Sequence, residues 1–305
     1  MKILILGASG FLGKNLLLCL PKEFETTSVY HNSKDFVDFI NKNNINTKLI
    51  QCDLSNKDEV FKLLDKEYDV VISLFSNPQP SESFNDPLYD FKNNALPIYN
   101  VLSSIKAKKC VYFSSGLVYE DHVNVVNPQE TILNPTIPYA ISKFSAEQFV
   151  KLAKKKGNID NYYIVRFWGA YGPYQSTTKI YSKLVKTFGI DKCSDFTIKG
   201  DGHSLIDAMY IDDTISAIIN MINSQERELV FDFSPHRPIS IFDLVMRAAK
   251  LFNIEPRIKF EGTSYETIDF HSNDSNYSTF SYEFTNIELG LMKLYDWQQA
   301  HKELL

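Results

Sequence analysis

The sequence predicts an α/β fold in which a doubly wound parallel sheet is followed by a smaller α/β lobe. Two observations carry this prediction. Short apolar runs alternate with amphipathic stretches through the first two thirds of the 305 residues, and most of the apolar runs lack the alternation of half-exposed strands. Parallel strands that helices cover on both faces have this pattern, and right-handed crossovers join them.

Six apolar runs are the expected strands of this sheet: Lys2–Leu6, Thr27–Tyr30, Lys48–Gln51, Val70–Leu74, Lys109–Ser114 and Tyr162–Phe167. Helical spacing of apolar residues predicts the helices between them: Phe11–Leu20, Lys34–Asn43, Lys57–Lys66, Pro87–Ile105 and Tyr139–Lys155. After Gly172-Pro173 the pattern changes, and a second set of elements is expected: Lys179–Gly189, Phe196–Lys199, a helix from near Asp212, Leu229–Phe233 and Ser240–Phe252. The tail after Gly262 is rich in Ser, Tyr, Asn and Thr and carries no clear pattern.

The composition excludes several classes of protein. With 44% hydrophobic and 23% charged residues it is that of an ordinary globular protein, and a net charge of −5 gives no support for binding to nucleic acid or an anionic membrane. No apolar run approaches the length of a membrane span, and the apolar start Met1–Leu6 is too short for a signal peptide, so we expect a cytoplasmic protein. The four cysteines show no CxxC spacing and the six histidines no i, i+4 pair, so we expect no metal site.

A glycine-rich turn follows the first expected strand at once and opens the first expected helix. It reads Gly7-Ala8-Ser9-Gly10-Phe11-Leu12-Gly13. One glycine permits the tight turn, one allows a pyrophosphate close to the backbone, and one lets the helix pack closely on the strand. The free N–H groups at the helix N-terminus then attract the phosphates. This position predicts a dinucleotide site on a Rossmann-type sheet rather than a turn that serves packing alone.

The end of the second expected strand discriminates between the two nicotinamide cofactors. An acidic residue there would bind the ribose hydroxyls of NAD and repel the 2′-phosphate of NADP. The sequence instead has His31-Asn32-Ser33-Lys34, with no acid before Asp35. All four side chains can donate a hydrogen bond to a phosphate, which favours NADP(H) over NAD(H). The alternative is an ordinary polar loop, with the ribose recognised elsewhere.

A candidate catalytic set follows the fifth strand. Tyr139 and Lys143 stand four residues apart, so on a helix both project from one face. A lysine ammonium near a phenol favours the phenolate and brings the phenol pKa toward a value useful for proton transfer. Ser115, at the end of the fifth strand, adds a hydroxyl donor. A Tyr-x-x-x-Lys spacing alone is common on helix surfaces, but its place after the glycine turn and the fifth strand favours a catalytic role.

Taken in order, these features resemble the extended short-chain dehydrogenase/reductases, the sugar-nucleotide-modifying NAD-dependent epimerase/dehydratase family. The resemblance covers nearly the whole chain. The further matching segments are Cys52-Asp53-Leu54, Asp86-Pro87-Leu88 with Asn94, Ser114-Ser115-Gly116-Leu117-Val118-Tyr119, Glu130, Pro135, Pro138, Glu147, Arg166-Phe167, Tyr171-Gly172-Pro173, Gly200-Asp201-Gly202 and Tyr210-Ile211-Asp212-Asp213.

The resemblance implies hydride transfer at a sugar carbon with a nicotinamide cofactor. Tyr139 would act as acid or base on the sugar oxygen, Ser115 would hydrogen-bond that oxygen, and Lys143 would tune Tyr139 and fix the cofactor ribose. Asp53 would meet the adenine amine, and Asn94 would support the active site from behind. The other residues expected around the cofactor are Leu54, Leu74, Phe75, Ser76, Ser114 and Phe167.

The chain is expected to divide into two parts and to pair with a second copy. Residues 1–172, with part of 207–238 returning to them, would form the dinucleotide-binding domain, and residues 173–305 mainly a substrate-binding lobe. In a homodimer the helices Pro87–Ile105 and Tyr139–Lys155 would pair as a four-helix bundle. Their apolar residues beyond one core face are Leu96, Ile98, Val101, Phe144, Phe149 and Leu152.

Departures from the family pattern bear on the reaction and the substrate. Dehydratases of the family carry an Asp-Glu pair after the catalytic Thr, where this chain has Gly116 and Leu117, which cannot move a proton. The family's Asn before Tyr-Gly-Pro is Gly169, and the arginine that clamps the substrate diphosphate is Ile206, which cannot replace that charge-assisted contact. Other cations would hold the diphosphate, or the substrate is not a usual sugar nucleotide. The candidate substrate contacts are Asn77, Gly116, Lys179 and Arg237.

Three functions are therefore open. The first is an NADP(H)-dependent reductase of a 4-keto, 6-deoxy sugar nucleotide, which the absent acid pair and the non-acidic second strand favour. The alternative is a 4-epimerase that retains NAD, because the same catalytic set serves both reactions. A non-catalytic, cofactor-sensing protein would need a damaged catalytic set, and this one is intact.

Overall fold

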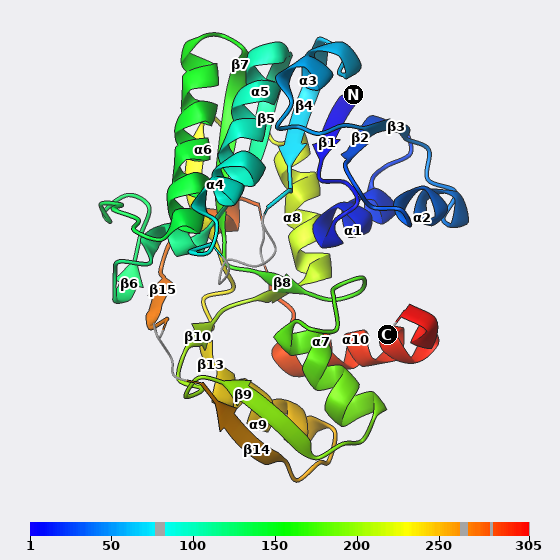
Figure 1. Ribbon diagram of the computed structural model, residues 1–305, viewed down its shortest axis with the longest axis vertical. Coiled ribbons are helices and arrows are strands. Elements are labelled where there is room, and N and C mark those ends of the chain that lie inside the picture. Colours follow the sequence, from blue (N-terminus) through cyan, green and yellow to red (C-terminus); the bar gives the residue numbers. More distant parts are fainter. Residues whose placement is uncertain (77–82, 263–267, 281–282, 305) are drawn as a thin grey trace. The chain divides into compact units, whose positions relative to one another are not determined.

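The computed structural model describes residues 1–76, 83–262, 268–280 and 283–304 (Figure 1). The chain forms two compact units. The first, called the sheet unit below, comprises Met1–Asp121, Pro128–Phe167 and Ile218–Phe233. The second unit comprises His122–Asn127, Trp168–Ala217 and Ser234–Leu305.

Seven parallel strands form the centre of the sheet unit, in the order β12-β7-β5-β4-β1-β2-β3. Their bounds are β1 Lys2–Leu6, β2 Glu25–Tyr30, β3 Lys48–Gln51, β4 Glu67–Ser73, β5 Lys106–Ser115, β7 Ile159–Phe167 and β12 Leu229–Phe233. The register places Leu4 between Thr27 of β2 and Val71 of β4. The order runs outward from β1 in both directions, so the predicted doubly wound parallel sheet is confirmed.

Helices cover both faces of this sheet (Figure 1). Their bounds are α1 Phe11–Cys19, α2 Phe36–Lys42, α3 Lys57–Leu63, α4 Pro87–Asp90, α5 Leu96–Ser104, α6 Pro138–Lys155 and α8 Ile211–Asn223. One buried cluster joins Leu4 of β1 to Ile98 of α5 and Val150 of α6, so α5 and α6 share a face. On the other face Lys109 of β5 caps the C-terminus of α8, where its Nζ donates to the Met221 carbonyl at 2.8 Å.

The helix predicted over Pro87–Ile105 is interrupted. α4 and α5 flank a π-helical turn, Phe91–Ala95. Pro97 has no backbone N–H and cannot donate to the carbonyl four residues earlier, so the regular ladder is broken before it. Four predicted strands also begin too late. β4, β5 and β7 each start three residues earlier than predicted and β2 starts two residues earlier, with more polar ends that the apolar pattern does not reveal.

The second unit is built of short elements. Among its described residues β10 pairs antiparallel with β13, while β11 with β8, β14 with β9 and β15 with β6 pair in parallel. The bounds are β6 Asn124–Val126, β8 Ala170–Tyr171, α7 Ile180–Leu184, β9 Asp195–Lys199, β10 Leu205–Ile206, β11 Met209–Tyr210, β13 Ile239–Ser240, α9 Ile241–Leu251, β14 Arg257–Glu261, β15 Phe270–Ser272 and α10 Ile287–Ala300. None of the described helices of the chain is long and apolar enough to cross a membrane.

Candidate active site

The glycine turn has the geometry of a phosphate-binding turn. Gly7 has a φ of +78°, and a Cβ there would lie 2.7 Å from the backbone nitrogen of Phe75. A Cβ on Gly13 would lie 2.4 Å from the Ala8 carbonyl oxygen, so glycine lets α1 approach the strand closely. Gly10 is the N-cap of α1 and offers no side-chain cap. The first N–H groups of α1 are therefore open to an anion, with Ser9, Phe11 and Leu12 around them.

The adenosine end of the expected cofactor site lies after β2 and β3. Asp53 closes a local turn, since its Oδ1 accepts hydrogen bonds from the Ser55 amide at 2.9 Å and hydroxyl at 2.7 Å. Burial works to raise the pKa of Asp53, but the Ser55 hydrogen bonds and the charge of His31 lower it overall. Leu54 follows and is half-buried.

The four polar residues after β2 are open to solvent. His31, Asn32 and Lys34 are exposed and Ser33 is half-buried. The His31 carbonyl accepts a hydrogen bond from the side-chain Nε2 of Gln51 at 2.9 Å, which ties this loop to β3. The side chains of this loop are thus free to meet a ligand in the adenosine region.

Tyr139 stands in the first turn of α6 and is only 6% exposed. Its hydroxyl hydrogen-bonds with the hydroxyl of Ser76 at 3.0 Å. Burial raises the pKa of Tyr139, the hydrogen bonds with Ser76 and Ser115 lower it, and the charge of Asp90 raises it again. The net shift is upward, so without a ligand the phenol is a neutral acid. Ser76, expected at the cofactor, thus contacts the candidate catalytic tyrosine. Leu74 and Phe75, also expected at the cofactor, connect the end of β4 to Ser76.

Lys143 lies one helical turn further along α6 and is 2% exposed. Its Nζ donates a hydrogen bond to the Phe113 carbonyl of β5 at 2.8 Å. Burial lowers the pKa of Lys143 to about 7, against the opposing charge of Glu147. The lysine is therefore anchored on the sheet and has a pKa near neutrality.

A buried network of charges stands behind this pair. Arg166 of β7 forms two hydrogen bonds with Glu147 of α6, at 3.1 and 2.9 Å, and one with the Tyr119 hydroxyl at 2.7 Å. Tyr119 in turn donates to Asp232 of β12 at 3.0 Å. The hydroxyl of Ser114, a residue expected at the cofactor, donates a hydrogen bond to Glu147 at 2.7 Å. The network fixes α6, and with it Tyr139 and Lys143, against three strands.

A second chain of hydrogen bonds supports α6 from the π-helical turn. Asn94 is fully buried and donates from Nδ2 to the Ser142 hydroxyl at 2.9 Å and to Asp90 at 3.4 Å. The Ser142 hydroxyl in turn donates a hydrogen bond to the Tyr139 carbonyl at 2.7 Å. Asp90 is fully buried and was missed from the sequence, because a single acid in an amphipathic helix normally faces solvent.

Aromatic side chains pack together at the carboxyl ends of β5, β7 and β12. Phe167, at the end of β7, packs on Phe113 and Phe233 with ring centroids 5.3 and 6.2 Å away. Gly116 and Leu117 open a 3₁₀ turn directly after Ser115, whose hydroxyl accepts the Leu117 N–H at 3.2 Å. No acid or base stands in these two positions after Ser115. Asn77, a predicted substrate contact, lies outside the described residues.

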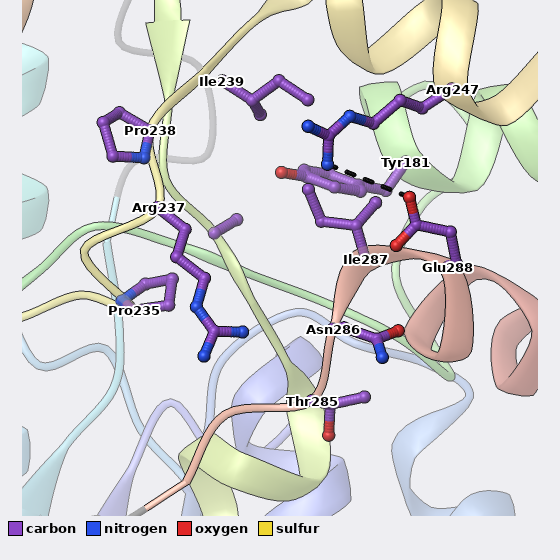
Figure 2. A pocket seen from close by; sticks show the side chains of 11 residues that line it. Tyr181, Pro235, Arg237, Pro238, Ile239, Arg247, Thr285, Asn286, Ile287 and Glu288 are labelled. Carbon is purple, nitrogen blue, oxygen red and sulfur yellow. Dashed lines mark ion pairs between the residues drawn. The ribbon is translucent and has the colours of Figure 1, made fainter.

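The two predicted substrate cations of the second unit differ in their surroundings. Lys179 is exposed at the N-cap of α7. Arg237 lines a cavity of about 300 Å³ that Figure 2 shows, and Lys179 is not among the lining residues. The cavity is lined by Tyr181, Ala208, Pro235, Arg237, Pro238, Ile239, Arg247, Thr285, Asn286, Ile287 and Glu288. Arg247, on the exposed face of α9, was missed, because nothing in its helical spacing sets it apart from a surface cation.

Among the described residues no group of three or more His, Cys, Asp or Glu side chains could hold a metal ion.

Comparison with known proteins agrees with this geometry. The family model described as "NAD dependent epimerase/dehydratase family" matches residues 3–231. A dTDP-D-glucose 4,6-dehydratase of Dictyostelium discoideum is 30% identical over 83% of this chain, which spans 62% of that relative's length, less than two thirds. A candidate UDP-glucose 4-epimerase of Methanocaldococcus jannaschii is 30% identical over 72% of this chain and 73% of its own.

Among solved structures, the UDP-glucuronic acid 4-epimerase of Bacillus cereus, in complex with UDP-glucuronic acid and NAD, superposes with a TM-score of 0.84. The identity is 24%, and the match covers 98% of this chain and 99% of that one, which shows the shared fold. With the family model matching three quarters of the residues, the chain belongs to the NAD dependent epimerase/dehydratase family, in the extended short-chain dehydrogenase/reductase superfamily.

Proposed function

We propose that this protein is a nucleotide-sugar 4-epimerase that retains NAD(H). The observation that carries the proposal is the buried Tyr139, hydrogen-bonded with Ser76 and one helical turn from the anchored Lys143. No acid or base stands in the two positions that follow Ser115. Such a set moves one proton at one sugar oxygen. It offers nothing for the removal of water from neighbouring carbons.

The roles of the residues follow from their places. Tyr139 takes and returns the proton of the sugar 4-hydroxyl, and Ser115 hydrogen-bonds that oxygen. Lys143, one helical turn from the phenol, holds the ribose of the cofactor. The glycine turn and Asp53 bind the phosphates and the adenosine. A nicotinamide cofactor bound there supplies the hydride acceptor and donor.

This proposal reverses the order of the two enzyme functions that the sequence leaves open. The relatives named above are epimerases and a dehydratase, and a dehydratase would need proton-moving groups where this chain has Gly116 and Leu117. A sugar-nucleotide epimerase is therefore better supported than a reductase, and the reductase becomes the second candidate.

One observation favours that second candidate, an NADP(H)-dependent reductase of a 4-keto, 6-deoxy sugar nucleotide. The exposed loop His31–Lys34 can donate hydrogen bonds to a 2′-phosphate and has no acid to repel it. Under this candidate NADPH would bind at least tenfold tighter than NADH, about 1.4 kcal/mol. Titration of both cofactors against intrinsic fluorescence would reveal the difference.

Cofactor retention and turnover together test the epimerase proposal. The purified protein is expected to carry NAD(H) through dialysis and to interconvert UDP-glucose and UDP-galactose, or another pair of 4-epimers, without added cofactor. Loss of cofactor on dialysis, with NADPH oxidation by a 4-keto-6-deoxy sugar nucleotide (dTDP, GDP, CDP or UDP form), would replace the epimerase with the reductase.

We also propose a homodimer through α4, α5 and α6. Leu88, Tyr89 and Ile141 are exposed apolar side chains on these helices, and Phe149 and Leu152 line a shallow groove between α5 and α6. Ile98 and Val101, expected at the interface, are instead fully buried in the sheet unit. Light scattering is expected to give twice the 35.1 kDa chain mass at micromolar concentration, whereas the monomer mass would contradict the dimer. None of the four cysteines forms a disulfide, which suits the reducing cytoplasm that we keep as the expected compartment.

A further inference from the structure

Arg237 is a cation without a partner at the wall of the cavity in the second unit. Its backbone N–H donates to Asp207 at 3.0 Å, but its guanidinium forms no hydrogen bond or ion pair with any residue that the structure describes. Figure 2 shows the guanidinium extending from the Pro235–Ile239 wall toward the side that carries Thr285 and Asn286. A guanidinium offers five N–H donors in a planar fork that suits an oxyanion.

The segment that carries Arg237 is held rigidly. Ser234, fully buried, donates its hydroxyl to Asp207 and accepts the His236 N–H at 3.0 Å. His236 adopts a φ of +54° and its Nδ1 contacts the Ser272 carbonyl at 2.7 Å. Arg237 alone has an exposed side chain between Ser234 and Pro238. A buried carboxylate, a strained histidine and two nearby prolines thus fix the backbone from which the Arg237 side chain extends.

A second guanidinium lies on the same cavity. Arg247 of α9 forms an ion pair with Glu288 of α10, with 3.8 Å between nitrogen and oxygen and both side chains about half exposed. A long, solvated pair of this kind contributes little stability, so Arg247 can turn to a stronger partner at small cost. The lining residues thus carry two cations and one acid, and are net positive.

The N-terminus of α10 faces the cavity from the other side. Asn286 caps the helix with its side-chain carbonyl, which accepts the Leu289 N–H at 2.8 Å. The first free N–H groups of this 14-residue helix belong to Ile287 and Glu288, both lining residues. They add partial positive charge where Arg237 points.

We propose that this cavity binds the diphosphate of the nucleotide sugar, with Arg237 as its main ligand and Arg247 as the second. The identity of the ligand rests on the proposed function, whereas the oxyanion chemistry rests on the cavity. A single carboxylate would be matched by one guanidinium, but two linked phosphates engage both and the helix N-terminus as well.

Position 206 provides an independent check. Ile206 of β10 pairs directly with Ile239 of β13, and direct cross-strand partners project from the same face. Because Ile239 lines the cavity, an arginine at position 206 would bring its charge toward the same ligand. Ile206→Arg should therefore restore the binding that the loss of Arg237 removes.

Calorimetric titration of the full-length protein with UDP, uridine and NAD tests the proposal without using activity. Arg237→Ala should raise the Kd for UDP tenfold or more while leaving uridine and NAD binding unchanged, and Arg237→Lys should lose less. Ile206→Arg in the Arg237→Ala background should recover at least threefold. The control is Arg257→Ala, which removes an exposed arginine of the same unit that pairs with Asp195 away from the cavity. Thermal melting verifies that the variants are folded.

The outcomes separate this proposal from the proposed function. If wild type binds UDP, dTDP or GDP and Arg237→Ala binds it equally well, Arg237 is not the ligand and the epimerase remains. If Arg237→Ala weakens UDP-glucuronate but not UDP, the oxyanion is a sugar carboxylate and the diphosphate assignment is wrong. If wild type binds no nucleoside diphosphate, both proposals fall.

Discussion

Arg166 of the sheet unit and Arg237 of the second unit are held in opposite ways. In the sheet unit Arg166 is buried and donates hydrogen bonds to Glu147 and Tyr119, so its charge is paired inside the protein. In the second unit Arg237 is exposed on a rigid loop, with no partner for its guanidinium among the described residues. A buried charge must be paired, and such pairs fix geometry, whereas an exposed charge on a fixed mount is available to a ligand. We therefore expect Arg166 to stabilise the geometry of α6 and Arg237 to be available for binding.

The largest effect is expected from a substitution that abolishes turnover but leaves ligand binding unchanged. Tyr139→Phe removes the only group proposed to move the proton, so kcat should fall about a thousandfold. The affinities for NAD and UDP should stay within twofold, because the phenol contributes little to either. Steady-state kinetics and calorimetry measure both, with Tyr99→Phe on α5 as the control. A variant that kept more than a tenth of the wild-type kcat would show that another acid acts.

The next effect tests the contrast between buried and exposed pairs. Glu147→Gln leaves the charge of Arg166 buried without its counter-ion, which should lower the free energy of unfolding by about 3–5 kcal/mol. Asp195→Asn breaks the exposed pair with Arg257 and should have little effect. Urea unfolding followed by circular dichroism measures both. Equal effects of the two substitutions would remove the distinction between the units.

A smaller effect is expected in the pH dependence of stability. Burial lowers the pKa of Lys143 to about 7 in the folded protein, below the ordinary 10.5 of the unfolded chain. Between these values the unfolded chain binds more protons, so this group makes the free energy of unfolding rise with pH. Lys143→Met should flatten that rise between pH 7 and 8.5, with Lys179→Met as a control for the loss of a lysine. Parallel curves for wild type and Lys143→Met would contradict the buried, shifted lysine.

The sheet unit was largely predictable from the sequence. Apolar strands without alternation and the turn from Gly7 to Gly13 fix its topology, because burial and backbone sterics act locally in the chain. The spacing of Tyr139 and Lys143 likewise places both on one face of α6. The contacts behind them were harder to foresee, since Asp90 looks like a surface residue and no sequence pattern reveals the hydrogen bond from Ser114 to Glu147.

The second unit was predicted in part. The expected elements Lys179–Gly189, Phe196–Lys199 and Ser240–Phe252 correspond to α7 with the π-helical turn Val185–Ile190, to β9 and to α9. The remaining elements were missed for a physical reason. Its strands β8, β10, β11 and β13 have two residues each, too few for any period to show. α10 lies in the polar tail that carried no clear pattern, although the cap Asn286 and the apolar Leu291 and Leu294 follow helical spacing. The cavity depends on which loops meet, and Arg247 joins Arg237 only through the fold of α9 against α10.

The fate of one hydrogen atom tests the central claim that the buried set of the sheet unit inverts a sugar carbon. A UDP-sugar deuterated at C4 is incubated with the purified protein in ordinary water, without added cofactor, and the product is examined by NMR. The epimerase account predicts the C4 epimer with deuterium retained at C4, and no product with Tyr139→Phe. Loss of the label to solvent, or a product altered at C6 instead of C4, would contradict it.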